Sequence, residues 1–284
     1  SRRMTTRYYN VARHVMALTA GDDIFALLDN CRPFEVTPSE PLISVVIREN
    51  APLPEAWTEE WRQEEEGDEI ACGHSEGNPL FVFRSQGKMA GWMECGSDYR
   101  RAMVYTGELP KLAIDNAMMI AFALATAEMD TLLFHASVVC RGGKAYMFLG
   151  PSGTGKSTHT RLWLRYIDGS RLLNDDNPVV RIEADGEAEV YGSPWSGKTP
   201  CYVNEHYPLG AIVRLRQAPH NAIRRMSPIE AYATMASSVS GKRWEKNIAD
   251  GLHRALNSLT ATARMWHMDC LPDEAAAKMT SSTI

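Results

Sequence analysis

The sequence predicts an α/β protein in two parts: a small β-rich N-terminal region, residues 1–108, and a larger domain, residues 109–284. Three observations carry this prediction. Short apolar, β-like segments separated by turn residues run through the first part. In the second part, a strand, a glycine-rich turn and a helix follow one another at residues 144–167. An antiparallel hairpin then follows at residues 179–191.

Composition places the chain in a broad class. It has 284 residues, of which 44% are hydrophobic and 23% charged, as in ordinary globular proteins. The net charge of −5 disfavours a general nucleic-acid binder, because phosphate contacts need a basic face. Nucleic acid is therefore not an expected partner.

Cysteine usage and hydropathy indicate a cytoplasmic protein. The six cysteines are scattered without a C-x-x-C pair, which is typical of reduced thiols. The N-terminus lacks a signal-peptide pattern. The longest apolar run, residues 117–127, is too short to span a membrane, so no membrane partner is expected.

The N-terminal region is expected to be a set of short strands. A strand is predicted at residues 42–47, a hairpin at residues 80–84 and 88–93 around Gln86-Gly87, and another strand at residues 101–105. Residues 55–69 are strongly acidic. They are interpreted as a solvated loop or helix, with a surface for a basic partner as the alternative.

The larger domain is expected to start with a helix over residues 109–130, from its helical spacing of apolar residues. A strand at residues 132–139, a Gly142-Gly143 turn and a second strand at residues 144–149 come next. Two strands joined by a tight turn thus precede the glycine-rich segment.

Residues 150–157 read Gly-Pro-Ser-Gly-Thr-Gly-Lys-Ser and match the phosphate-binding loop G-x-x-x-x-G-K-[ST]. Glycines let backbone N–H groups converge, and with the helix N-terminus they form a site for polyphosphate. Lys156 is expected to neutralise the β- and γ-phosphates of ATP, and Ser157 to bind Mg²⁺. The residues predicted to bind the phosphates are Gly150, Pro151, Ser152, Gly153, Thr154, Gly155, Lys156, Ser157 and Thr158.

The elements after the helix that follows the glycine-rich loop are predicted from turn residues and apolar spacing. Gly169 ends that helix, and residues 170–176 form a short strand that Asn177-Pro178 terminates. The remaining predicted elements are the hairpin at 179–182 and 188–191, a loop at 192–200, strands at 209–215 and 263–268, helical structure at 228–259 and a last short helix from 272.

Asp175 and Asp176 end the strand that follows the loop helix, and this spacing brings two carboxylates close to the loop. Phosphoryl transfer needs one group to hold Mg²⁺ and another to take the proton of an attacking hydroxyl. An Asp-Asp-Asn-Pro turn with capping roles is the structural alternative. The pair is therefore a candidate for both catalytic tasks.

These motifs, in the order His135-Ala-Ser-Val-Val, Gly-Gly-Lys, the loop and Leu-Leu-Asn-Asp-Asp, resemble bacterial HPr kinase/phosphorylase and its smaller HPr-kinase-related proteins. The resemblance covers residues 130–216 well and 217–275 loosely. It implies a mixed-sheet P-loop domain of the HPr kinase/phosphoenolpyruvate carboxykinase type. The hairpin after Asp176 agrees, because a doubly wound parallel sheet would need a crossover helix there.

The resemblance also implies roles for single residues. His135 is expected near the reacting phosphate, and one aspartate of the pair acts as base while the other binds metal. Which has which role stays open, with Ser157 and Asp176 expected at the metal. Residues 196–198 are expected to line the pocket, with a simple turn beside a buried tryptophan as the alternative. Arg214 and Arg216 lie on one side of a strand, to stabilise phosphate or to pair with surface acids.

Some positions depart from that family. Thr158 stands where it typically has Glu, and its C-terminal signature and N-terminal domain are not found. These departures speak against HPr itself as the substrate.

Taken together, the residues and the resemblance predict an ATP- and Mg-dependent kinase that phosphorylates a hydroxyl, a serine of a small protein or peptide. A kinase for a small metabolite, a nucleotide-responsive binding protein without catalysis and a simple ATPase are the alternatives. The resemblance further implies a homo-oligomer.

Overall fold

The computed structural model describes residues 3–242 and 244–284. It divides the chain into two compact units, Ser1–Ala125 and Thr126–Ile284. Each unit contains a mixed sheet with helices, so the predicted α/β class is confirmed.

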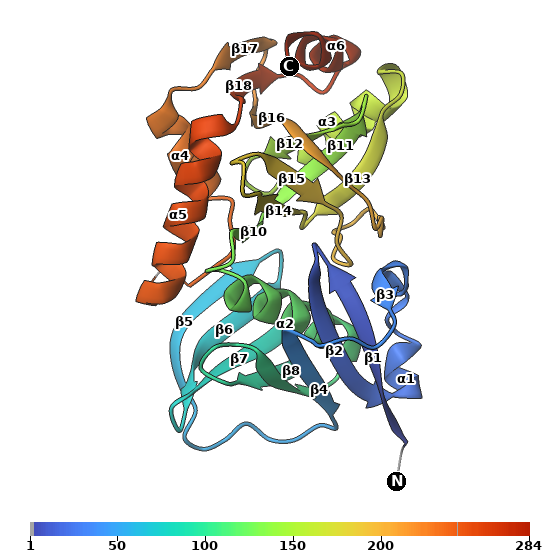
Figure 1. Ribbon diagram of the computed structural model, residues 1–284, viewed down its shortest axis with the longest axis vertical. Coiled ribbons are helices and arrows are strands. Elements are labelled where there is room, and N and C mark those ends of the chain that lie inside the picture. Colours follow the sequence, from blue (N-terminus) through green and yellow to red (C-terminus); the bar gives the residue numbers. More distant parts are fainter. Residues whose placement is uncertain (1–2, 243) are drawn as a thin grey trace. The chain divides into compact units, whose positions relative to one another are not determined.

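The first unit is built on a sheet with the strand order β3-β1-β2-β4-β9-β8-β7-β6-β5 (Figure 1). The pairs β2–β4 and β4–β9 are parallel, and the other described pairs are antiparallel. Its strands are β1 Met4–Val11, β2 His14–Gly21, β3 Glu35–Val36, β4 Ile43–Arg48, β5 Thr58–Glu65, β6 Asp68–Ser75, β7 Asn78–Ser85, β8 Lys88–Cys95 and β9 Arg101–Thr106. Its helical segments are α1 Asp22–Phe25, η1 Asp29–Phe34 and α2 Pro110–Ala125.

Helix α2 packs on this sheet through a buried apolar face that includes Ile114, Met118 and Phe122. The approach is close, because a Cβ added at Gly91 would lie 2.7 Å from Ala113 Cβ. The helix therefore belongs to the first unit. The division falls after it, whereas the sequence-based boundary at residues 108 and 109 stood before it.

The acidic segment was predicted wrongly, since it forms strand β5 and the start of β6 instead of a loop or helix. All eight residues of β5 are exposed. The alternation that marks a half-buried strand is therefore missing from its sequence. Charged side chains are typical of an edge strand, which they protect from pairing with other chains.

The second unit is built on a sheet with the order β10-β14-β15-β16-β12-β11-β13, with β18 paired to β16 and β17 to β18. Its strands are β10 Thr131–Leu133, β11 Ala136–Arg141, β12 Lys144–Leu149, β13 Arg171–Asp176, β14 Val179–Ile182, β15 Ala188–Tyr191, β16 His206–Gln217, β17 Ala222–Arg225 and β18 Met265–Cys270. Its helices are α3 Lys156–Tyr166, α4 Pro228–Ala236, α5 Lys246–Thr262 and α6 Glu274–Thr283.

The strand predicted at residues 132–139 is in fact two strands, β10 and β11, separated at Phe134 and His135. The pairing explains the break: β10 pairs with β14, whereas β11 pairs with β12 and β13. The chain therefore changes partners between the two strands, which a continuous apolar run does not reveal.

Strand directions bring several chain ends to one edge of this sheet. β12, β16 and β18 are parallel, and β11 runs antiparallel to both β12 and β13. β13 is therefore parallel to β12. The carboxyl ends of β12, β13, β16 and β18 and the start of β11 consequently share one edge.

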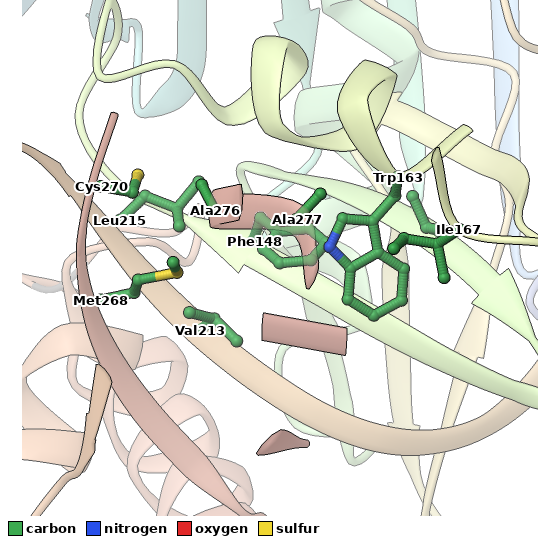
Figure 2. Close-up of a cluster of buried hydrophobic side chains, with 10 residues drawn as sticks. Phe148, Trp163, Ile167, Val213, Leu215, Met268, Cys270, Ala276 and Ala277 are labelled. Carbon is green, nitrogen blue, oxygen red and sulfur yellow. The ribbon is translucent and has the colours of Figure 1, made fainter. Parts of the chain in front are cut away.

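One face of the sheet carries a buried cluster between the strands and helices α3 and α6 (Figure 2). Phe148, Val213 and Met268 from the strands meet Trp163 of α3 and Ala276 of α6. Thr280 of α6 accepts a hydrogen bond from Trp163 Nε1 at 2.9 Å. The packing fixes the helix that follows the glycine-rich loop against the sheet.

Candidate functional site

The glycine-rich loop joins the end of β12 to the start of α3 at Lys156. Gly150, Gly153 and Gly155 have φ values of 152°, 81° and 92°, in the region that favours glycine. A Cβ at Gly150 would also lie 2.5 Å from Thr154 Oγ1. The motif glycines are thus required by the backbone path of this loop.

Contacts within and beside the loop hold it in shape. Thr154 Oγ1 donates to the Pro151 carbonyl at 2.6 Å, and Lys156 Nζ donates to the Gly150 carbonyl at 2.6 Å. At the end of β16, Gln217 Nε2 donates to the Gly153 carbonyl at 3.1 Å. Gln217 therefore ties the loop to the neighbouring strand.

Ser157 and Asp175 meet at the beginning of α3. The Ser157 hydroxyl donates to Asp175 Oδ1 at 2.8 Å, and Asp175 is only 5% exposed. The Asp175 carboxyl group is therefore buried and held by a hydroxyl at the start of the helix. The structure thus brings Ser157 to Asp175, whereas the sequence-based expectation grouped Ser157 with Asp176 at the metal.

Asp176 instead faces His135 across the sheet edge. His135 Nε2 and Asp176 Oδ1 lie 2.9 Å apart, and the side chains are 40% and 36% exposed. Pairing of Ala136 with Asp176 between β11 and β13 produces this contact. The two aspartates therefore have different environments: one is buried beside the loop, and the other is open and paired with a histidine.

A buried amide holds the turn that carries both aspartates. Asn174 is fully buried, and its Nδ2 donates to Ser193 Oγ and to the Trp195 carbonyl, each at 3.2 Å. Its Oδ1 accepts from the Asn177 backbone N–H at 2.8 Å. This network joins the end of β13 to the loop after β15.

The segment at residues 196–198 lies against the aspartates. Gly197 N–H donates to the Asp175 carbonyl at 2.6 Å, and Ser196 Oγ is 3.1 Å from the same oxygen. Lys198 is exposed. The segment thus supports the backbone of the aspartate turn.

Arg214 and Arg216 both pair with acids. Arg214 Nη2 lies 3.0 Å from Glu230 Oε1, and Arg216 binds both carboxylate oxygens of Asp269 at 2.8 and 3.0 Å. Hydrogen bonds from Arg216 and His267 lower the pKa of Asp269 to about 2. The carboxylate therefore stays charged at ordinary pH.

His267 connects these two pairs. Its Nδ1 accepts from Arg214 Nε at 2.9 Å, so its Nε2 carries the proton and donates to Asp269 Oδ1 at 2.9 Å.

Thr158, which the sequence placed among the phosphate-binding residues, lies apart from this network. Its hydroxyl accepts a hydrogen bond from Arg161 at 3.4 Å.

Sequence reasoning missed three residues that shape the site: Asn174, Gln217 and His267. The only feature of the sequence that could have pointed to Asn174 is its position next to the aspartate pair. The contacts of Gln217 and His267 join segments distant in the chain, so no local pattern marks them.

Within the described residues, no three His, Cys, Asp or Glu side chains gather into a protein-only metal cage. The same part of the chain contains no helix that is both long and apolar enough to cross a membrane.

The fold and the site define a mixed α/β protein in which a glycine-rich strand–helix junction meets two aspartates and a histidine. The chain belongs to the family of the SynChlorMet cassette protein ScmC, whose family model matches residues 106–260. That description names a cassette and states no chemical activity. No curated protein matches the chain.

Assignment to the HPr kinase/phosphorylase family is therefore wrong, because the family model that matches is that of ScmC. The resemblance rested on a few short motifs. Such motifs report the chemistry of phosphate binding, which can recur in different families, and do not establish descent.

Proposed function

We propose that this protein is an ATP- and Mg²⁺-dependent kinase that transfers the γ-phosphoryl group to a hydroxyl. The observation that carries the proposal is the meeting of Ser157 with Asp175, at 2.8 Å, beside a loop of phosphate-binding sequence. The exposed His135–Asp176 pair at the same sheet edge adds a group that can take a proton. Together they supply the parts that phosphoryl transfer needs.

The loop residues fit a polyphosphate chain. Gly150, Gly153 and Gly155 allow the backbone conformations that direct N–H groups toward one point, and α3 begins immediately after them. Lys156 Nζ rests on carbonyls of the same loop, within reach of a bound phosphate. These residues would bind ATP and balance the charge of its β- and γ-phosphates.

Ser157 and Asp175 fit Mg²⁺. Both present oxygen atoms, the ligands that Mg²⁺ prefers, and the Asp175 carboxyl group is buried beside the loop. Bound there, Mg²⁺ would neutralise charge on the phosphates. Asp175 is accordingly proposed on the metal side, directly or through a water molecule.

Asp176 is proposed as the base. Its carboxylate is partly exposed and would accept the proton of the attacking hydroxyl, while the His135 N–H orients it. Both side chains are partly exposed, so an attacking hydroxyl can reach them from solvent. A serine of a protein or peptide is therefore the acceptor class to test first, with a small hydroxylated metabolite as the second.

The test compares wild type with Lys156→Ala, Asp175→Asn and Asp176→Asn for Mg·ATP binding by calorimetry and for slow ATP turnover. We expect Lys156→Ala to weaken binding and to lower turnover by about 10²–10³-fold. Asp176→Asn should keep the binding and lose the turnover. Asp175→Asn should raise the Mg²⁺ concentration that turnover requires.

Three outcomes would change the proposal. Near-normal turnover in Lys156→Ala would contradict the kinase assignment. Binding without turnover against peptides and metabolites would favour a nucleotide-responsive binding protein. Absence of nucleotide binding in wild type would remove the basis of the proposal.

A further inference from the structure

The direction of an in-line transfer determines the side of the γ-phosphorus on which the leaving oxygen and the diphosphate attached to it must lie. Attacking and leaving oxygens are roughly in line on opposite sides of the γ-phosphorus. The strand order β18-β16-β12-β11-β13 places the loop, which follows β12, between two groups of strands. Asp176, the proposed general base, and its partner His135 lie on the β11–β13 side. The leaving group should consequently extend toward β16 and β18.

An exposed arginine and an exposed histidine lie on that side. Arg216, near the end of β16, has a side chain that is 67% exposed, and His220 follows in the next loop. Gln217, between them, touches the glycine-rich loop through the Gly153 carbonyl. The carboxyl end of β16 thus contacts the loop through Gln217, while the side chain of Arg216 points to the other face of the strand.

The planar guanidinium group of Arg216 is held in one orientation. Two hydrogen bonds to Asp269, at 2.8 and 3.0 Å, fix the guanidinium plane, and His267 fixes Asp269 in turn. A guanidinium oriented in this way can stack on an aromatic ring while its edge remains paired. Asp269 also balances its charge, so the exposed face is suited to a nucleobase more than to a further phosphate.

We propose that the carboxyl ends of β16 and β18 form a nucleoside subsite, in which the base of a nucleoside triphosphate stacks on the guanidinium of Arg216. The inference rests on the proposed kinase function and deepens it. It assigns a binding place to the nucleoside of the ATP that the proposed function already names as donor.

Binding of Mg·ATP and of inorganic tripolyphosphate with Mg²⁺, measured by calorimetry, separates the nucleoside contribution from that of the phosphates. We expect wild type to bind ATP more tightly, and Arg216→Ala to lose roughly tenfold in ATP affinity with tripolyphosphate binding unchanged. Arg216→Lys keeps the charge but not the plane, so it should behave like Arg216→Ala. The matched control is Arg225→Ala, an exposed arginine on β17 at the other end of β18.

The subsite is overturned if Arg216→Ala weakens both ligands equally, if it weakens neither, or if Arg216→Lys retains full ATP affinity. Equal binding of ATP and tripolyphosphate by wild type would also overturn it, while leaving the proposed kinase function intact. Wild type that binds neither ligand would overturn the kinase function and the subsite with it.

Discussion

At the scale of single residues, Asp176 combines its proposed role as a base with an unfavourable backbone conformation. Its φ of 142° lies in a region that side chains other than glycine rarely adopt. The surrounding contacts, from the bridge to Ser196 and the Gly197 hydrogen bond to Asp175, hold the chain in this conformation. Strain retained at a residue with a partly exposed carboxylate supports the proposed role of that carboxylate as a base.

Replacing Asp176 by glycine and by alanine separates backbone strain from side-chain chemistry. Both variants lack the carboxylate, but only glycine relieves the strain. We expect Asp176→Gly to have a free energy of unfolding about 1 kcal/mol above that of Asp176→Ala. Chemical denaturation followed by circular dichroism measures the difference. Equal stability of the two variants would show that the residue is not strained.

At the scale of elements, the end of β13 and the loop after β15 act as one unit. The Asn174 amide bridges them, and Ser193 Oγ lies 2.6 Å from the Asn177 carbonyl, to which it donates. Gly192 is required at the start of this loop, because a Cβ there would lie 1.9 Å from the Val203 carbonyl oxygen. The position of both aspartates thus depends on a second loop that is distant in sequence.

Removing the Asn174 side chain should therefore affect both stability and chemistry. We expect Asn174→Ala to lower the free energy of unfolding of the second unit by about 2–3 kcal/mol, because buried polar groups lose their partners. Turnover of Mg·ATP should fall more than Mg·ATP affinity, since the loop remains intact. Denaturant titration and parallel binding and turnover assays measure these effects.

Arg171→Gln is the control for that variant. Arg171 begins the same strand and pairs with Glu205 at the surface. Exposed pairs contribute about 0–1 kcal/mol, so this substitution should change stability little and turnover not at all. An Asn174→Ala protein that matched Arg171→Gln in every measurement would contradict the positioning role.

At the scale of the whole molecule, the candidate site lies in the second unit alone. The matched family region, residues 106–260, covers most of this unit and also contains α2 of the first. Inside the second unit, α3 is fixed to α6 through Thr280, whose hydroxyl lies 2.8 Å from His159 Nε2. Burial lowers the pKa of His159 to about 4.

This buried histidine predicts a pH dependence of stability. The folded pKa is below the unfolded value, so between roughly pH 6.5 and pH 4 the unfolded chain binds the proton and the folded chain does not. Stability is retained above this window and is lost as the pH falls through it. We expect His159 to account for a loss of about 2 kcal/mol between pH 7 and pH 4.5.

Unfolding of the second unit at the two pH values measures this loss in wild type and in His159→Gln. Over this pH range, the free energy of unfolding of His159→Gln should fall by about 2 kcal/mol less than that of wild type. The exposed His253→Gln is the control and should behave as wild type. Equal acid sensitivity of wild type and His159→Gln would contradict the prediction.

Much of the second unit could be predicted from local sequence. The strand at residues 144–149, the helix after the loop and the hairpin around residues 179–191 agree with β12, α3, β14 and β15 within a residue or so. Each has a strong local signal, such as glycine punctuation or apolar periodicity. Strands β1, β2 and β17 were not predicted individually, and the acidic β5 was misinterpreted, because pairing with neighbouring strands decides these segments.

The sequence by itself determined the chemistry available: a glycine-rich loop followed by Lys156 and Ser157, and a pair of aspartates one helix and one strand later. Loop conformation and helix initiation depend on neighbouring residues, so a short motif is sufficient to specify them. Only the tertiary structure decided that Ser157 meets Asp175, that His135 meets Asp176, and that Arg216 is held by Asp269. These contacts follow from strand order and register, which are set by pairing between distant parts of the chain.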